Sequence, residues 1–201
     1  MKKLAVDIVL LPPKEIHDLA LEVNKNLNPK EGEIVFENGD MLPHVSLLMG
    51  VLEIGRLKEV EKLIRNGAKM FKPLALEIKE IEVDTLSDGT SVSGFGVSRT
   101  PRLRELQQWL ARQSETLLGN DVGAKMFYGQ AIREGIIEYL RNFRTEHSFE
   151  KFRPHITLGV GKAENKSKFP IPFTASKIAL CHLGNYGTCR KILFSTELGN
   201  S

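Results

Sequence analysis

Two histidines stand in two copies of one short pattern, and each copy carries a hydroxyl side chain two residues further on. The first copy is Pro43-His44-Val45-Ser46-Leu47, and the second is Pro154-His155-Ile156-Thr157-Leu158. Histidine exchanges its proton near neutral pH, with an ordinary pKa of about 6.5, so one imidazole can accept a proton while another donates one. The Ser and Thr hydroxyls can donate hydrogen bonds to phosphate oxygens. The pattern is typical of phosphate chemistry.

Each copy lies in a run that predicts a β-strand, where residues two apart share a side. His44 therefore projects with Ser46, and His155 projects with Thr157, while the aliphatic residues between them are buried. Two such strands side by side would place two imidazoles and two hydroxyls around one small cleft. Cleaving or forming a cyclic phosphate diester needs little beyond this arrangement, and no metal is required. We therefore expect His44 and His155 to be catalytic.

Other interpretations of the same residues are less well supported. A two-histidine metal site is disfavoured because no carboxylate or cysteine stands at a recognisable ligand spacing beside either motif. Ser46 as a covalent nucleophile is disfavoured because it lies on a strand and not in a nucleophile elbow. The remaining histidines are expected to be surface or satisfied core residues: His17, His147 and His182.

The composition is that of a soluble globular protein. The chain has 201 residues with 41% hydrophobic and 26% charged residues, and its net charge of +3 includes no long Lys/Arg block typical of genome binding. The N-terminal apolar run contains Asp7 and ends in two prolines, so we interpret it as a strand and not a signal peptide. No run is long enough to cross a bilayer.

We expect a cytoplasmic protein in which Cys181 and Cys189 are reduced and packed, although a cross-strand pair is geometrically conceivable.

Helical and strand patterns alternate along the chain without a glycine-rich phosphate loop. Turn signals at Asn38-Gly39 and Ser87-Asp88-Gly89 indicate hairpins and antiparallel pairing, which favours an α+β fold. Gly159 continues the row of His155 and Thr157, so we expect open space there for a ligand or another backbone. The predicted strands are 4–11, 34–36, 44–52, 74–83, 91–97, 155–160, 178–183 and 191–195, and the predicted helices are 14–27, 56–69, one from Pro101, and 132–143.

The paired His-x-Ser/Thr-Leu motifs resemble those of the two-histidine (2H) phosphoesterase superfamily, which includes 2′-5′ RNA ligase-like proteins and RNA 2′,3′-cyclic phosphodiesterases. Phe152-Arg153-Pro154-His155-Ile156-Thr157-Leu158 is an especially good match. The resemblance implies one bilobal domain over 1–201, with two antiparallel sheets, outer helices, pseudo-twofold symmetry and a central cleft. It also implies that His44 and His155 are catalytic and that Ser46 and Thr157 bind phosphate.

The expected activity is metal-independent phosphoesterase action on a 2′,3′-cyclic phosphate or a 2′-5′ linkage of RNA or a nucleotide. We expect no cofactor, no membrane association and no obligate protein partner. Candidate substrate contacts are Arg153, which precedes the second motif, and Lys125 and Tyr128 in a basic-aromatic loop where a base could stack. The sequence leaves two alternatives open: a nucleotide- or RNA-binding module without significant turnover, and a cyclic phosphodiesterase of small metabolites.

Overall fold

The computed structural model describes residues 2–30, 33–36, 39–86, 88–129, 131–164 and 168–199. Strands and helices alternate along most of this chain, as the periodic patterns predict. The strands are β1 (Lys3–Leu11), β2 (Val45–Glu53), β3 (Leu74–Thr85), β4 (Ser91–Val97), β5 (Leu118–Gly119), β6 (His155–Val160), β7 (Ile171–Ala175), β8 (Lys177–Leu183) and β9 (Cys189–Glu197). The α-helices are α1 (Lys14–Asn26), α2 (Leu57–Met70), α3 (Pro101–Gln113) and α4 (Glu134–Glu146), and the 3₁₀ turns are η1 (Ile54–Arg56), η2 (Ala124–Met126), η3 (Phe149–Lys151) and η4 (Asn185–Gly187).

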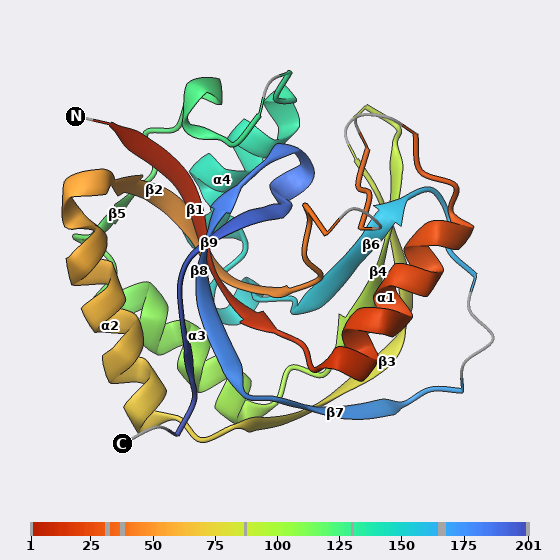
Figure 1. Cartoon of the computed structure of the whole chain (residues 1–201), viewed down its shortest axis with the longest axis horizontal. Helices are drawn as coiled ribbons and strands as arrows, with labels where there is room; N and C mark the ends of the chain where they lie inside the picture. The colour runs from red at the N-terminus through yellow and green to blue at the C-terminus, as the bar shows by residue number, and fades with distance from the viewer. Residues whose placement is uncertain are drawn as a thin grey trace.

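The strands of the described residues form one curled sheet in the order β7-β3-β4-β6-β2-β1-β8-β9, with β5 paired to β2. All of its ladders are antiparallel. The two halves of the sheet meet where β2 pairs β6, and that ladder has one residue pair, Val45 with Ile156. Figure 1 shows β3, β4 and β6 on one side of this junction and β1, β8 and β9 on the other. The α+β prediction is confirmed, and the two expected sheets are joined at the centre.

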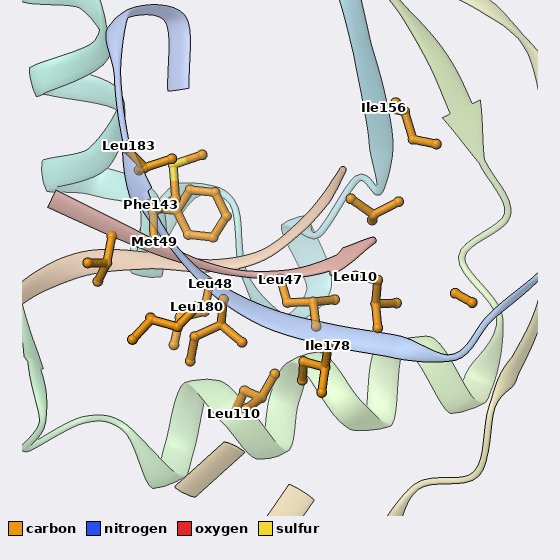
Figure 2. Close-up of a cluster of buried hydrophobic side chains, with 14 of the residues drawn as sticks. Leu10, Leu47, Leu48, Met49, Leu110, Phe143, Ile156, Ile178, Leu180 and Leu183 are labelled. Atoms are coloured by element: carbon orange, nitrogen blue, oxygen red, sulfur yellow. The ribbon is translucent and has the colours of Figure 1, made fainter. Parts of the chain in front are cut away.

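The helices bury the aliphatic residues of the sheet. Helix α1 packs against β6, α2 packs against β8 and β9, and α3 and α4 both pack against β2. Figure 2 shows Leu47 and Ile178 on the side of the strands that faces Leu110 of α3, whereas Met49 lies with Phe143 of α4 on the other side. Helix α4 therefore covers part of the sheet face opposite to α3.

Residues 34–36 do not form the predicted strand, because a side chain replaces the partner strand. The buried Asn24 of α1 donates from Nδ2 to the carbonyls of Ile34 at 2.8 Å and Leu158 at 2.7 Å, and its Oδ1 accepts from Phe36 N at 3.1 Å. Ile34 and Phe36 are buried, as expected for an apolar run. One amide thus ties this segment and the second motif strand to helix α1.

Two strands were not predicted from the sequence. Strand β7 contains Pro172 and pairs with β3 at the edge of the sheet formed by the described residues, where a missing N–H is tolerated. Strand β5 is only two residues long. The predicted turns at 38–39 and 87–89 include Asn38 and Ser87, which lie outside the described residues.

The expectation that the two cysteines are reduced is wrong in this structure. Cys181 of β8 and Cys189 of β9 form a disulfide, with their Cα atoms 5.6 Å apart, a separation usual for such a bond. The β8–β9 ladder shifts register twice before it reaches Cys189, which brings the two cysteines together. The sequence spacing does not reveal these shifts.

None of the helices in the described part of the chain combines the length and the apolar composition that a membrane crossing requires.

Replacing Asn24 with Ala should destabilise the protein by roughly 2–4 kcal/mol, because three buried backbone groups would lose their hydrogen-bond partner. Urea unfolding of wild type and variant measures this difference. Glu22→Ala, an exposed position on the same helix, is the control and should change stability by less than about 0.5 kcal/mol. Equal effects of the two substitutions would contradict the bridging role of the Asn24 amide.

Candidate active site

The pairing of β2 with β6 brings the two motifs together. Because antiparallel strands pair in opposite order, the register at Val45 and Ile156 places His44 across from Thr157 and Ser46 across from His155. Val45 and Ile156 are fully buried on the other face. The arrangement has local twofold symmetry, with one imidazole and one hydroxyl from each strand.

The two imidazoles are held in the same way. His44 Nδ1 lies 2.7 Å from the carbonyl oxygen of Leu42, and His155 Nδ1 lies 3.0 Å from the carbonyl oxygen of Arg153. A carbonyl only accepts, so Nδ1 carries the proton in both rings and Nε2 of a neutral ring is left with its lone pair. The intervening residue is proline in each motif, whose fixed φ constrains the bend that returns the carbonyl to the ring. This explains the proline in the repeated pattern.

A β-bulge follows the hydroxyl residue in each motif. In β2 the register against β1 shifts after Ser46, so that Leu47 is an extra residue, and Leu47 and Leu48 are both fully buried. In β6 the register against β4 shifts after Thr157, so that Leu158 is the extra residue. A bulge re-aims the side chains that follow it.

The bulge at Leu158 corrects the prediction for Gly159. A Cβ on Gly159 would lie 2.7 Å from Leu27 Cδ1 and 3.0 Å from Asn24 Nδ2, so this residue faces α1 and not the side of His155. Strict alternation along the strand does not hold across the bulge. The space that was expected for a ligand is occupied by the end of the helix.

His44 is the more enclosed of the two imidazoles, with a side chain that is 10% exposed. Burial lowers the pKa of His44 to about 4, the Leu42 carbonyl offsets part of this effect, and positive charge on His155 lowers it further. His44 is therefore neutral at neutral pH. The effect of His155 also indicates that the two rings are close enough to interact.

Asp7 lies beside His44, with Oδ2 3.8 Å from Nε2. It is fully buried, and in the described part of the chain neither carboxyl oxygen has a hydrogen-bond partner with ordinary geometry. Burial raises the pKa of Asp7 to about 7, and the nearby Ser46 hydroxyl and Leu48 N–H offset only part of that rise. No role was predicted for Asp7 from the sequence, although a charged residue inside an apolar strand is a visible signal.

Helix α4 and the residue that caps its C-terminus add two rings near the site, and neither was predicted to belong to it. Tyr139 and His147 pack with ring centroids 4.1 Å apart. Burial raises the pKa of Tyr139, and the charge of Asp7 raises it further. Burial lowers the pKa of His147, because the charged form of this side chain is the protonated one, and the positive charge of His155 lowers it further. These two rings in contact therefore form part of the electrostatic surroundings of Asp7 and His155.

The predicted substrate contacts are less closely tied to the imidazoles. Arg153 holds His155 through its carbonyl, but its side chain is 71% exposed and pairs with Glu82 at 3.3 Å. Lys125 is an exposed residue of η2, and Tyr128 is 45% exposed and packs edge-on against His182, with ring centroids 5.6 Å apart. Their contact with a substrate stays a prediction.

Across the described ranges, no group of three or more His, Cys, Asp and Glu side chains has the arrangement to hold a metal ion.

The free energy of unfolding of Asp7→Asn, relative to that of wild type, should increase as the pH rises. The unfolded carboxyl, with a pKa of 3.8, loses its proton before the folded one, with a pKa of about 7. Wild type therefore loses roughly 4 kcal/mol of stability as the pH rises through this window, and the variant does not. Urea unfolding from about pH 4 to 8 measures the difference, and Asp121→Asn, whose side chain is 90% exposed, is the control. A pH-independent difference between wild type and Asp7→Asn would contradict the raised pKa.

No protein-family model matches the chain, and no curated protein matches its sequence. Solved structures match its fold over nearly their whole length. TT0787 of Thermus thermophilus superposes with a TM-score of 0.64 at 18% identity, covering 98% of this chain and 100% of that chain. E. coli LigT complexed with NADP+ gives 0.57 at 16% identity, and LigT complexed with 3′-AMP gives 0.55 at 16% identity, each covering 100% of both chains. The chain therefore has the fold of TT0787 and LigT, and the fold expected from the resemblance to 2H phosphoesterases is confirmed.

Proposed function

We propose that this chain is a metal-independent 2H phosphoesterase that acts on a 2′,3′-cyclic phosphate or a 2′-5′ linkage of RNA or a nucleotide. One observation carries the proposal. The carbonyl oxygens of Leu42 and Arg153 orient the rings of His44 and His155 in the same way, where the central strands β2 and β6 pair. Both rings present Nε2 as the exchangeable nitrogen, and each stands across from a hydroxyl. Acid–base catalysis at a phosphorus atom requires two such groups.

The ligands of a structural neighbour support the substrate class. E. coli LigT has been crystallised with phosphate, 3′-AMP, ATP and NADP+. Each of these is a phosphate or contains one, and three of them contain adenosine. We therefore propose a phosphorylated nucleotide or an RNA end as the substrate of this chain.

In the proposed reaction, one histidine accepts a proton from the attacking water as its oxygen bonds to phosphorus. The other histidine donates a proton to the ribose oxygen as the bond from that oxygen to phosphorus breaks. Ser46 and Thr157 donate hydrogen bonds to the non-bridging oxygens, where negative charge increases in the transition state. Each half of the sheet supplies one imidazole, so the unit of activity is the whole chain.

His44→Ala and His155→Ala should each lower kcat/KM for a 2′,3′-cyclic mononucleotide by about 10²–10⁴-fold in buffer that contains EDTA, because each removes one proton-transfer group. Product formation is followed by chromatography. His17→Ala is the matched control, since this histidine lies on α1 with a side chain 34% exposed, and it should retain wild-type activity. Equal activity of wild type and His44→Ala would contradict the proposal. Tight nucleotide binding without turnover, unchanged by either substitution, would favour the binding-module alternative.

Ser46→Ala and Thr157→Ala should each lower kcat by about 10²-fold with a smaller change in KM, because hydrogen bonds to developing charge act mainly in the transition state. The exchanges Ser46→Thr and Thr157→Ser keep the hydroxyl and should retain most of the activity. Steady-state kinetics on the same cyclic nucleotide measures these effects. If the Ala and hydroxyl-preserving variants were equally impaired, the hydroxyls would have no role beyond packing.

A further inference from the structure

Asp7 is an unexplained buried group in the described structure. Its side chain is fully enclosed, and among the described residues neither carboxyl oxygen has a hydrogen-bond partner with ordinary geometry, although the Ser46 hydroxyl and the Leu48 N–H are near enough to lower its pKa. Buried carboxyls are normally paired or hydrogen-bonded, because an isolated charge is costly in a low-dielectric interior. Strand β1 is otherwise apolar from Leu4 to Leu11, so an aliphatic residue at this position would meet no such penalty.

The groups around Asp7 come from three elements. On the β2 side, His44 Nε2 lies 3.8 Å from Oδ2, and the Ser46 hydroxyl and Leu48 N–H also face the carboxyl. On β8, Cys181 lies opposite Asp7 in the ladder but is disulfide-bonded and does not titrate. From α4, Tyr139 is the titratable group that feels the charge of Asp7. His44 is thus the neighbour of Asp7 that the proposed reaction protonates.

The geometry of His44 leaves one nitrogen for this exchange. Its Nδ1 donates to the Leu42 carbonyl, so a proton taken up during catalysis can bind only to Nε2, the ring nitrogen that lies 3.8 Å from Asp7 Oδ2. An imidazolium formed in this enclosed position needs a counter-charge, since burial disfavours the charged ring. The carboxylate of Asp7 is placed to supply it.

We propose that Asp7 is a positioning residue that stabilises the imidazolium formed when His44 accepts the proton of the attacking water. This inference rests on the proposed function and assigns His44 as the base in hydrolysis. The water proton moves to His44 Nε2 as the new oxygen–phosphorus bond forms, and His155 gives its proton to the departing ribose oxygen. His44 then loses its proton to solvent and His155 regains one, which restores both rings.

The protonation of the two groups supports this assignment. Burial favours the neutral forms of both, with the pKa of Asp7 raised to about 7 and that of His44 lowered to about 4. The first proton that the pair takes up as the pH falls therefore binds mainly to Asp7, and the two groups titrate as a coupled unit. The form competent as a base has both groups deprotonated.

Asp7→Asn tests the proposal, because Asn has nearly the same shape and cannot carry charge. The variant should lower kcat for a 2′,3′-cyclic mononucleotide by about 10–100-fold with KM nearly unchanged, and should move the acid limb of the kcat/KM profile to lower pH by at least about one unit. Met49→Leu, which alters packing directly opposite Asp7 on β2, is the matched control and should leave the acid limb in place. An acid limb that does not move in Asp7→Asn would overturn the proposal.

A second measurement separates this inference from the proposed function. Nuclear magnetic resonance can follow the titration of the His44 ring, whose signals are assigned because they disappear in His44→Ala. In wild type these signals should titrate near the pKa of the coupled pair. In Asp7→Asn they should titrate only at lower pH. An unchanged His44 titration in Asp7→Asn would overturn the role of Asp7 even if the enzyme is active. If the two groups titrate together but the protein has no cyclic phosphodiesterase activity, the pairing of Asp7 with His44 is supported. The proposed function is then overturned, and with it the role of Asp7 in positioning charge for the reaction.

Discussion

The antiparallel pairing of β2 with β6 is the constraint on which the rest of the structure depends. It consists of one residue pair, and the side chains of that pair, Val45 and Ile156, do no chemistry. They are buried in the core, and their burial fixes which face of each strand the neighbouring residues occupy. A slip of one residue would turn His44 or His155 toward the interior, because side chains alternate along a strand. The positions of both imidazoles are therefore set by the packing of two aliphatic residues.

Local features next to the pair complete this arrangement. The proline before each histidine bends the chain so that a backbone carbonyl accepts a hydrogen bond from the ring. The bulge after each hydroxyl residue adds one residue whose aliphatic side chain is buried in the core. In β2 this bulge lets Leu47 and Leu48 both be buried, while Met49 rejoins the face that carries Ser46 and Asp7. The same face is covered further along by α4, which brings Tyr139 and His147 toward the site. Backbone geometry thus does most of the positioning.

The sequence predicted what depends on local pattern. The period of the apolar residues located most strands and helices, and the repeated motif predicted which side chains of β2 and β6 are buried. It did not reveal features that depend on contacts between distant segments. The amide of Asn24 replaces a strand partner for 34–36, and register shifts bring Cys181 to Cys189. The surroundings of Asp7 come from β2, β8 and α4, so its burial beside His44 could not be read from β1 alone.

The strand order has a consequence for the two ends of the chain. Strands β3, β4, β6 and β7, from Leu74 to Ala175, form one half of the sheet, whereas β1 and β2 combine with β8 and β9 to form the other. One half is thus inserted into the sequence of its counterpart, and β1 lies between β2 and β8. Shortening the protein from its amino or carboxyl end removes strands from the same half. Loss of β1 or β9 therefore affects the half of the sheet that supports His44, while β6, which carries His155, keeps its strand partners β4 and β2.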